Sequence, residues 1–290
     1  MTHEVLVVGS ANADLVVQAD RRPAAGETVL GGDTVISPGG KGANTAVAAA
    51  KLGADVALVA AIGDDPYGAM LTESLRGAGV HTDLLRTVSR PTGIAYITVT
   101  PDGENSILVS PGANGELGPA HVVDALTGAK VLVASLEVPL HTVESAVAAA
   151  AGAGVRTVLN LSPTAKVSSR TLAALDVLLV NEHEAAWLLG SDAELAGLLE
   201  LGPRAAVVTL GARGALVITP SGTTEIASPE VQAVDTTGAG DGFAGALTAA
   251  LAGGAELEPA ARRAVRVAAI SVTRPGAQPS YPSADELAPW

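Results

Sequence analysis

The stretch VDTTGAGDGFAG (234–245) places two carboxylates, two threonines and closely spaced glycines directly before a run rich in Ala and Leu. The run FAGALTAALAGG predicts a helix that begins near Asp241 and stops at the following glycine pair. Gly238, Ala239 and Gly240 would then present backbone N–H groups at the positive end of the helix dipole. This is the arrangement that binds anions such as phosphate.

Asp241 has two possible roles beside such an anion site. A carboxylate there can take a proton from an attacking hydroxyl group. The helix dipole favours the ionised form, so we expect Asp241 to be charged at pH 7. An aspartate at the start of a helix is also a common N-cap. The residues alone leave catalytic base and helix cap as alternatives.

The same glycines match a dinucleotide fingerprint, because Gly240, Gly242 and Gly245 have the spacing G-x-G-x-x-G. Glycine occupies 33 of the 290 positions, so roughly 0.4 such matches are expected by chance. A true fingerprint normally follows the first strand of its unit, whereas this one comes late and carries Asp241 in the loop that would receive pyrophosphate. We therefore reject a dinucleotide site.

A second glycine-rich stretch is SPGGKGANTAVAAAKLG (37–53). It is not a Walker A loop, because Lys41 is followed by glycine rather than by Ser or Thr. Backbone donors, Lys41 and Asn44 could converge on a polyhydroxylated ligand ahead of a helix. The alternative is that the glycines only allow tight packing against a sheet.

Apolar runs alternate with Ala-rich stretches of helical length, which predicts an α/β fold with a mostly parallel sheet covered on both faces. Asp14, Glu137 and the segment NEHE (181–184) follow such runs, so we expect them at the carboxyl ends of strands, where open α/β sheets bind ligands. The predicted strands are 4–9, 55–63, 130–136, 155–161, 176–181, 205–211 and 214–220.

Two segments break this pattern. Residues 13–36 and 92–110 alternate apolar and polar side chains, and the second contains the turn PDGEN (101–105). They predict a small sheet that projects from the core, either as a lid over a site or as an edge extension without a role. No repeat or linker interrupts residues 1–290, so we expect a single domain.

Composition excludes several classes of function. A net charge of -13 with only four lysines argues against a nucleic-acid partner. No apolar run reaches the roughly 18–20 residues of a membrane span. The chain has no cysteine, and its first strand begins too early for a signal peptide, so we expect a cytoplasmic enzyme. The five histidines follow no zinc-binding pattern in the sequence.

Together these stretches resemble the ribokinase family of carbohydrate kinases over nearly the whole chain. PGGKGAN (38–44) and DTTGAGDGFAGAL (235–247) are similar to its two long signatures. Shorter segments fall in family order: GSANAD (9–14), GETV (26–29), GEN (103–105), GAN (112–114), LEVP (136–139), NEHE (181–184), TLGARG (209–214) and GAQPSYP (276–282).

The resemblance implies a three-layer α/β sandwich with a small β-sheet lid. It implies transfer of the γ-phosphoryl group of ATP to a sugar hydroxyl, for D-ribose the 5-hydroxyl, with Mg²⁺ and an activating K⁺. It also implies a homodimer, because the lid of this family can mediate dimerisation.

Roles for single residues follow from the resemblance. Asp241 would be the catalytic base, and Gly238, Ala239 and Gly240 the anion hole. The sugar-contacting positions would be Asn12, Asp14, Gly40, Lys41, Gly42, Ala43, Asn44 and Glu137. The nucleotide and Mg²⁺–phosphate positions would be Asn181, Glu184, Thr209, Gly211, Ala212, Arg213, Gly214 and Gly240. The loops that hold K⁺, several through backbone carbonyls, would contain Asp235, Thr237, Ser271, Arg274, Gly276 and Ser280.

Departures from the closest pattern leave alternatives open. Val265 stands where family members can carry a polar residue near adenine, and Gly242 and Ala244 stand where larger polar residues are common. A kinase for 2-deoxyribose or fructose is a near alternative. A nucleoside or pseudouridine kinase needs a base-stacking surface, and Tyr96 is the single aromatic residue of the expected lid. A sugar-binding regulator without catalysis would not need Asp241, the glycines and N-x-x-E together.

Overall fold

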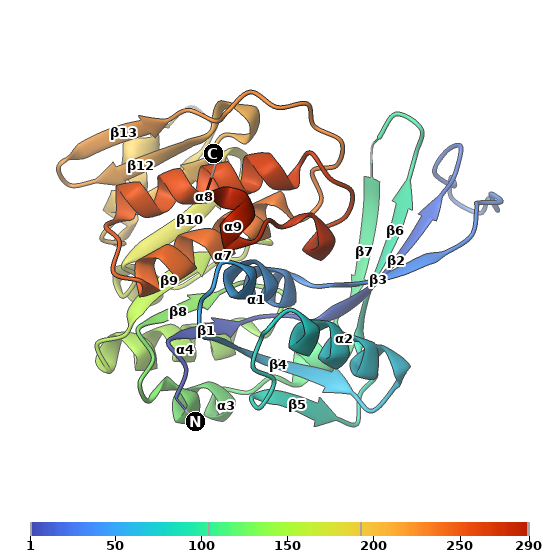
Figure 1. Ribbon diagram of the computed structural model, residues 1–290, viewed down its shortest axis with the longest axis horizontal. Coiled ribbons are helices and arrows are strands. Elements are labelled where there is room, and N and C mark those ends of the chain that lie inside the picture. Colours follow the sequence, from blue (N-terminus) through green and yellow to red (C-terminus); the bar gives the residue numbers. More distant parts are fainter. Residues whose placement is uncertain (1, 104, 192, 289–290) are drawn as a thin grey trace.

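The computed structural model describes residues 2–103, 105–191 and 193–288, and this part of the chain forms a large and a small sheet (Figure 1). The strand order of the large sheet is β13-β12-β11-β10-β9-β8-β1-β4-β5. Strands from β11 to β5 pair in parallel, whereas β12 and β13 add antiparallel pairs at one edge. The bounds are β1 Val5–Val8, β4 Val56–Gly63, β5 Leu85–Val88, β8 Val131–Ala134, β9 Arg156–Asn160, β10 Val177–Asn181, β11 Ala206–Thr209, β12 Ala215–Thr219 and β13 Gly222–Ile226.

Helices cover both faces of the large sheet. One face carries α1 (Lys41–Lys51), α2 (Pro66–Gly77), α7 (Ala239–Ala252) and α8 (Leu257–Ser271). The other face carries α3 (Ala120–Val123), α4 (Leu140–Gly152), α5 (Ser169–Ala173) and α6 (Glu182–Leu189), and α9 (Ala284–Leu287) ends the chain. Short 3₁₀ turns span Gly112–Glu116, Asp124–Leu126, Leu195–Leu201, Gly211–Arg213 and Gln278–Ser280. Among the described helices, none has the length and apolar character to cross a membrane.

Alternation along the central strand explains the layers. In β1, Val5 and Val7 pack into the core beneath α1 and α7, whereas Leu6 and Val8 pack into the core beneath α4. A strand that is apolar on both faces is typical of a buried parallel sheet. The predicted α/β fold class is therefore confirmed, and each of the seven predicted strands is present.

Two strands were missed in the sequence. β5 and β13 lie at the two edges of the large sheet, and apart from Ile226 their side chains are exposed or half-buried. Edge strands do not need a continuous apolar run, because one side of each strand meets solvent. Apolar composition therefore could not reveal them.

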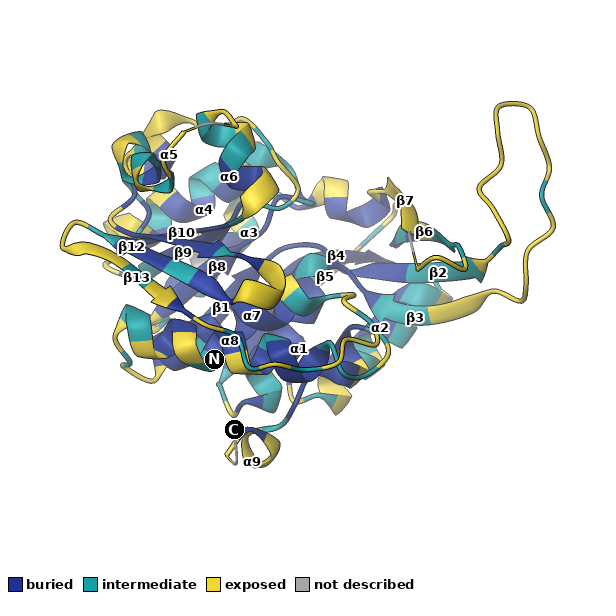
Figure 2. Cartoon of the chain, turned by 90° about the horizontal axis from the view of Figure 1, so that it is seen from above, coloured by how far each residue is buried: buried dark blue, intermediate teal, exposed yellow. Residues whose placement is uncertain are grey.

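The small sheet has the order β3-β2-β6-β7 and stands beside the main body (Figure 1). Its strands are β2 (Asn12–Gln18), β3 (Val35–Gly39), β6 (Gly93–Val99) and β7 (Asn105–Ser110). It is built from the two alternating segments predicted in the sequence. Residues 19–34 are a long connection without a strand that extends past the sheet (Figure 2). Glu104 of the predicted PDGEN turn lies outside the described residues.

Glycines let backbone segments approach closely beneath the site. A Cβ atom on Gly245 of α7 would lie 2.5 Å from the carbonyl oxygen of Thr45 in α1. A Cβ atom on Gly42 would lie 2.6 Å from the backbone of Gly9 at the end of β1. Because neither glycine has a side chain, α1 packs against both α7 and the central strand, which brings the N-terminal ends of two helices together.

Candidate active site

Asp241 lies in the first turn of α7 with 7% of its surface exposed. The N-cap is Gly238, in the left-handed conformation with φ 71°, so the interpretation of Asp241 as a helix cap is wrong. One carboxylate oxygen, Oδ2, accepts a hydrogen bond from the Asn44 side-chain nitrogen at 2.9 Å. This bond joins the first turns of α1 and α7.

The environment of Asp241 raises its pKa. Burial has the largest effect, while the charge of Lys41 and the hydrogen bond from Asn44 lower the pKa; Glu137 and Glu184 raise it further. The largest influence on the Asp241 pKa is therefore removal of the carboxylate from water, and Lys41 and Asn44 act in the opposite direction by favouring the ionised form. A buried carboxylate with a raised pKa is suited to take up a proton.

Glycines and polar side chains surround a cavity of about 180 Å³ at the start of α7. Gly238, Ala239 and Gly240 line it together with Asp241, as expected for an anion hole. Lys41 of α1 also lines this cavity. The cavity therefore brings backbone N–H groups at a helix N-terminus, a cation and a carboxylate into one space.

A second group of polar residues gathers where the chain passes from β1 of the large sheet to β2 of the small sheet. Glu137 Oε2 accepts hydrogen bonds from Ser10 Oγ at 2.5 Å and from the Lys41 backbone nitrogen at 3.3 Å. Asn12 Nδ2 lies 3.4 Å from the same oxygen. These contacts hold the predicted sugar-contacting residues Asn12, Lys41 and Glu137 together, and Ser10 is an addition that the sequence analysis missed.

Asp14 on β2 faces the same group, and its electrostatics are unusual. Burial raises the pKa of Asp14 to about 7, and the charges of Glu137 and Asp241 add to the effect, while Lys41 opposes it. Burial also lowers the pKa of Lys41, but the surrounding carboxylates, Asp241 above all, raise it by more. The ammonium group of Lys41 is therefore charged, and it attracts each of the surrounding carboxylates.

The glycines ahead of α1 have mainly a packing role. Gly40 has φ 93°, and a Cβ atom there would lie 2.7 Å from the Asn12 nitrogen. Ala43 is fully buried, and its N–H donates to the Ser10 carbonyl at 2.9 Å. Together with Gly42 against Gly9, these contacts favour the tight-packing alternative for Gly40, Gly42 and Ala43, which hold the sugar-contacting side chains in place from behind.

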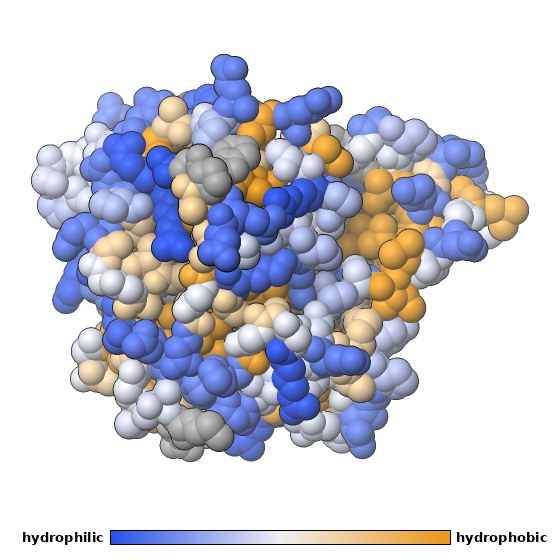
Figure 3. Space-filling model, viewed as in Figure 1, coloured by the Kyte–Doolittle hydropathy of each residue, from blue (hydrophilic) through white to orange (hydrophobic). Residues whose placement is uncertain are grey.

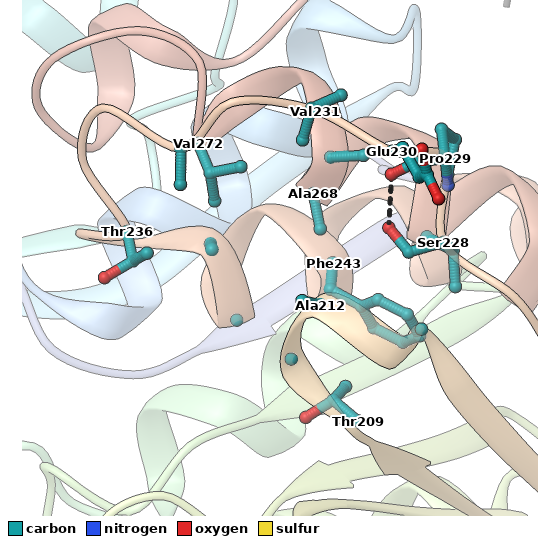
Figure 4. Close-up of a pocket in the computed structure, with 17 residues that line it drawn as sticks. Thr209, Ala212, Ser228, Pro229, Glu230, Val231, Thr236, Phe243, Ala268 and Val272 are labelled. Carbon is teal, nitrogen blue, oxygen red and sulfur yellow. Dashed lines mark hydrogen bonds between the residues drawn. The ribbon is translucent and has the colours of Figure 1, made fainter.

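A larger cavity of about 400 Å³, whose lining is drawn in Figure 4, adjoins the smaller one and shares Thr209, Thr236, Ala239 and Gly240 with it. The predicted nucleotide residues Thr209, Gly211, Ala212, Gly214 and Gly240 line it. Val265, which the family resemblance placed near adenine, also lines it. Most of the remaining wall was not predicted and is largely apolar: Ser228, Pro229, Glu230, Val231, Ala233, Phe243, Ala268, Ala269 and Val272. Arg213 is not among the lining residues, and its guanidinium pairs with Glu182 on the surface.

Asn181 and Glu184 have both a structural and a site role. They form a capping box at the start of α6, in which Asn181 Oδ1 accepts from the Glu184 N–H and Glu184 Oε2 accepts from the Asn181 N–H, each at 2.8 Å. Both also line the 180 Å³ cavity. The cap thus fixes a carboxylate at the edge of the anion site.

The loops predicted to hold K⁺ lie side by side. The Asp235 carboxylate accepts hydrogen bonds from the Thr237 N–H at 2.9 Å and the Gly276 N–H at 2.8 Å. The hydroxyl groups of Ser271 and Ser280 donate to carbonyls of their own turns. Arg274 pairs with Glu286 at 2.8 Å. These hydrogen bonds and this ion pair hold the loops in place beside each other.

Two residues that the sequence analysis did not single out support the site from below. Gln278 Nε2 donates to Asn44 Oδ1 at 3.0 Å, which leaves the Asn44 amino group directed at Asp241. The Tyr281 hydroxyl donates to the Gly238 carbonyl at 2.9 Å. A Cβ atom on Gly242 would lie 2.9 Å from the Tyr281 ring, so this ring occupies the space that a larger residue would need. Only the folded chain brings these partners together.

The raised pKa of Asp14 makes a prediction about stability. In the folded protein this group holds its proton up to about pH 7, whereas the unfolded value is 3.8. The stability that protonated Asp14 contributes is therefore present below about pH 4 and lost as pH rises through 7. At 1.36 kcal/mol per pKa unit, Asp14→Asn should be more stable than wild type by on the order of 2–4 kcal/mol at pH 8.

Urea unfolding of wild type and Asp14→Asn between pH 4.5 and 8 measures this difference in the free energy of unfolding. The range lies mostly between the unfolded and folded pKa values of Asp14, where the difference should change most. The gain should shrink toward the acidic end of the range. The exposed Asp33→Asn is the matched control and should show no such trend. Parallel stability curves for Asp14→Asn and wild type would contradict the burial of a destabilising charge.

Comparison with known proteins assigns residues 2–284 to the pfkB family carbohydrate kinases. The chain is 39% identical to a ribokinase of Bacillus subtilis, over 98% of this chain and 97% of that one. It is 34% identical to a deoxyribokinase of Salmonella typhi, over 98% and 97%. The structure of an Arabidopsis thaliana ribokinase complexed with ribose and ATP superposes with a TM-score of 0.92, at 32% identity, over 100% and 98%.

The family match spans nearly the whole chain, and the glycine-lined helix N-terminus with its buried Asp241 lies within the matched residues. On this evidence the protein belongs to the pfkB family of carbohydrate kinases.

Proposed function

We propose that this protein is a ribokinase, which transfers the γ-phosphoryl group of ATP to the 5-hydroxyl of D-ribose. The observation that carries the proposal is the position of Asp241, hydrogen-bonded to Asn44 and set at a glycine-lined helix N-terminus. On one side of it lie the polar groups of β2 and Glu137, which suit a sugar, and on the other the 400 Å³ apolar cavity, which suits a nucleotide base.

In the proposed mechanism, Asn12, Asp14 and Glu137 hold the sugar hydroxyls, with Lys41 and Asn44 at the start of α1. Asp241 orients the 5-hydroxyl and takes its proton as the oxygen attacks the γ-phosphorus. The backbone N–H groups at Gly238–Gly240 stabilise the negative charge on the transferred group. The reaction thus needs mainly positioning and charge stabilisation, and this chain supplies both from two helix N-termini.

The donor sets fit the two cations that the family implies. Mg²⁺ prefers oxygen ligands, and we assign it to the side of the cavity formed by Asn181 and Glu184. When bound, Mg²⁺ would neutralise phosphate charge. K⁺ is assigned to the loops of Asp235 and Gly276, with Thr237, Ser271, Arg274 and Ser280 contributing through backbone carbonyls. Asp235 ties the two loops together by its hydrogen bonds.

The small sheet is proposed to act as a lid and as a dimer surface. One of its strands carries Asn12 and Asp14, so its movement would open or cover the sugar site. Apolar side chains gather on the surface of the small sheet (Figure 3). An exposed apolar patch of this kind is typical of a surface that binds another protein. The exposed ones on the strands of the small sheet are Val35, Ile36, Tyr96, Ile107, Leu108 and Val109, and Leu30 is exposed on the connection between β2 and β3. A homodimer through this face in the cytoplasm is the simplest arrangement.

A deoxyribokinase is the nearest alternative, and the 34% identity to the Salmonella typhi protein supports it. The two sugars differ at the 2-hydroxyl, so the choice between them depends on one or two hydrogen bonds in the pocket. A nucleoside kinase is less well supported, because Tyr96 is 47% exposed and makes no stacking platform inside the site.

A coupled ADP-release assay with Mg²⁺ and ATP tests the proposal. The substrates are D-ribose, 2-deoxyribose, fructose, adenosine and pseudouridine, each with and without K⁺. Turnover on ribose that increases with K⁺ is the expected result. Turnover on 2-deoxyribose alone would replace the substrate, and folded protein that binds ribose without any turnover would indicate a regulator.

Asp241→Asn should remove the base while retaining the shape of the side chain. We expect turnover to fall by a factor of about 10²–10⁴, the usual contribution of general-base catalysis. Ribose affinity, measured by calorimetry, should change little. The exposed Asp285→Asn serves as the control. Equal losses of turnover and of ribose affinity would reduce Asp241 to a binding residue.

Gln278→Glu tests how Asn44 is oriented. A carboxylate at this position can only accept, so it would turn the Asn44 amide and direct its carbonyl at Asp241. We expect turnover to fall about tenfold or more, since a mispositioned catalytic group can cost about 10²-fold. The pH dependence of turnover should move upward, because Asp241 loses a donor that lowers its pKa.

Ser74→Ala is the control for this variant. Ser74 donates to Gln278 Oε1 at 3.1 Å, so its loss removes only the outer hydrogen bond. Gln278→Glu with an unchanged pH profile would mean that Gln278 does not position Asn44.

A further inference from the structure

Two histidines and two aspartates gather at the edge of the large sheet opposite the candidate active site. His3 precedes β1, Asp55 precedes β4, and His81 and Asp83 lie between α2 and β5. All four are therefore at the amino ends of neighbouring strands, whereas the candidate active site lies at the carboxyl ends. The label N marks this edge of the sheet in Figures 1 and 2, away from the small sheet.

Contacts within this cluster are close. His3 is 4% exposed, and its Nδ1 lies 3.4 Å from Asp55 Oδ1 while its Nε2 lies 3.2 Å from Asp83 Oδ2. His81 Nε2 lies 3.0 Å from the same Asp55 oxygen. The two imidazole rings are 4.4 Å apart between centroids. Within the described part of the chain, the ion-pair partners of both aspartates are these histidines.

The His3 ring meets a carboxylate oxygen at each of its two nitrogens. A neutral imidazole has a single N–H group, yet both ring nitrogens of His3 face a carboxylate. Either a second proton or a metal ion on the other nitrogen satisfies this arrangement.

The geometry suits a transition-metal ion. One ligand atom from each of His3, His81 and Asp83 lies within 4.8 Å of the others. The 3.2 Å between His3 Nε2 and Asp83 Oδ2 is close to the spacing of about 3.3 Å between two ligands of a tetrahedral ion with bonds of about 2.0–2.2 Å. His81 is 48% exposed, so its ring can rotate to complete the set.

Asp55 completes the pattern from behind. Histidines that bind metals usually donate their second nitrogen to a carboxylate, which fixes the ring. The contact between His3 Nδ1 and Asp55 Oδ1 has this form. The backbone is also held in place, because the Val5 N–H donates to the Asp55 carbonyl and the His81 N–H donates to the Val56 carbonyl, each at 2.9 Å. Backbone hydrogen bonds therefore hold together the three segments that carry the four side chains: the segment before β1, the segment before β4 and the connection before β5.

We propose that His3, His81 and Asp83 form a binding site for one divalent transition-metal ion of the zinc type, with Asp55 orienting His3. Imidazole and carboxylate ligands suit Zn²⁺, Co²⁺ and Ni²⁺ better than Mg²⁺. The ion would link the N-terminal segment, β4 and the connection to β5. It would stabilise the fold from the edge opposite the site of phosphoryl transfer and is independent of the proposed function.

Calorimetric titration of Zn²⁺ and the visible spectrum of Co²⁺ test the site. The full chain is used without a histidine tag, after treatment with EDTA. We expect one ion per chain, the absorption of tetrahedral Co²⁺ and a thermal unfolding temperature that rises with Zn²⁺. The variant His81→Gln should weaken the affinity at least tenfold and abolish the Co²⁺ absorption. Because His81 is half-exposed, its replacement should leave the fold intact.

The matched control is His141→Gln, an exposed histidine on α4. It should bind both ions as wild type does. Asp83→Asn gives a second measurement, with loss of affinity expected. The proposal is overturned if wild type binds no ion, or if His81→Gln and Asp83→Asn bind as tightly as the control. Binding that survives in both variants would place the ion among the carboxylates of the candidate active site instead.

Discussion

The hydrogen bond between Asn44 and Asp241 joins two helices whose positions determine the rest of the site. Its 2.9 Å length requires the first turns of α1 and α7 to lie next to each other. That proximity depends on Gly42 and Gly245, since a side chain at either would contact backbone at 2.5–2.6 Å. Gln278 then sets the direction of the Asn44 amide. Catalytic geometry in this protein is therefore a consequence of close helix packing.

Charge is the second constraint. Asp14, Glu137, Glu184 and Asp241 surround one lysine, and burial raises the pKa of both Asp14 and Asp241. Such a cluster is unfavourable for the isolated fold, because carboxylates are removed from water and repel one another. It is favourable for a site that must bind hydroxyl groups and accept a proton. Stability and function thus oppose each other at the same side chains.

The two cavities at the α7 N-terminus differ in character. Lys41, Asn181, Glu184 and Asp241 contribute charged and polar groups to the smaller one, whereas alanine, valine and Phe243 line most of the larger cavity. A base held mainly by apolar surface is selected by shape more than by hydrogen bonds. Val265 belongs to this wall, and its apolar side chain agrees with the neighbouring alanines of α8. The departure noted in the sequence is therefore part of a consistently apolar surface.

The sequence by itself determined the fold class, the seven main strands, the small sheet and the two glycine-rich segments, because periodicity and local turn chemistry are short-range properties. It also located Asp241, Asp14 and Glu137, since carboxylates at helix and strand ends can be read locally. Tertiary structure decided what these residues contact. Gln278 meets Asn44 across 234 positions, and His3 meets Asp83 across 80. Burial, which raises the pKa of Asp241, likewise exists only once the layers have packed around it.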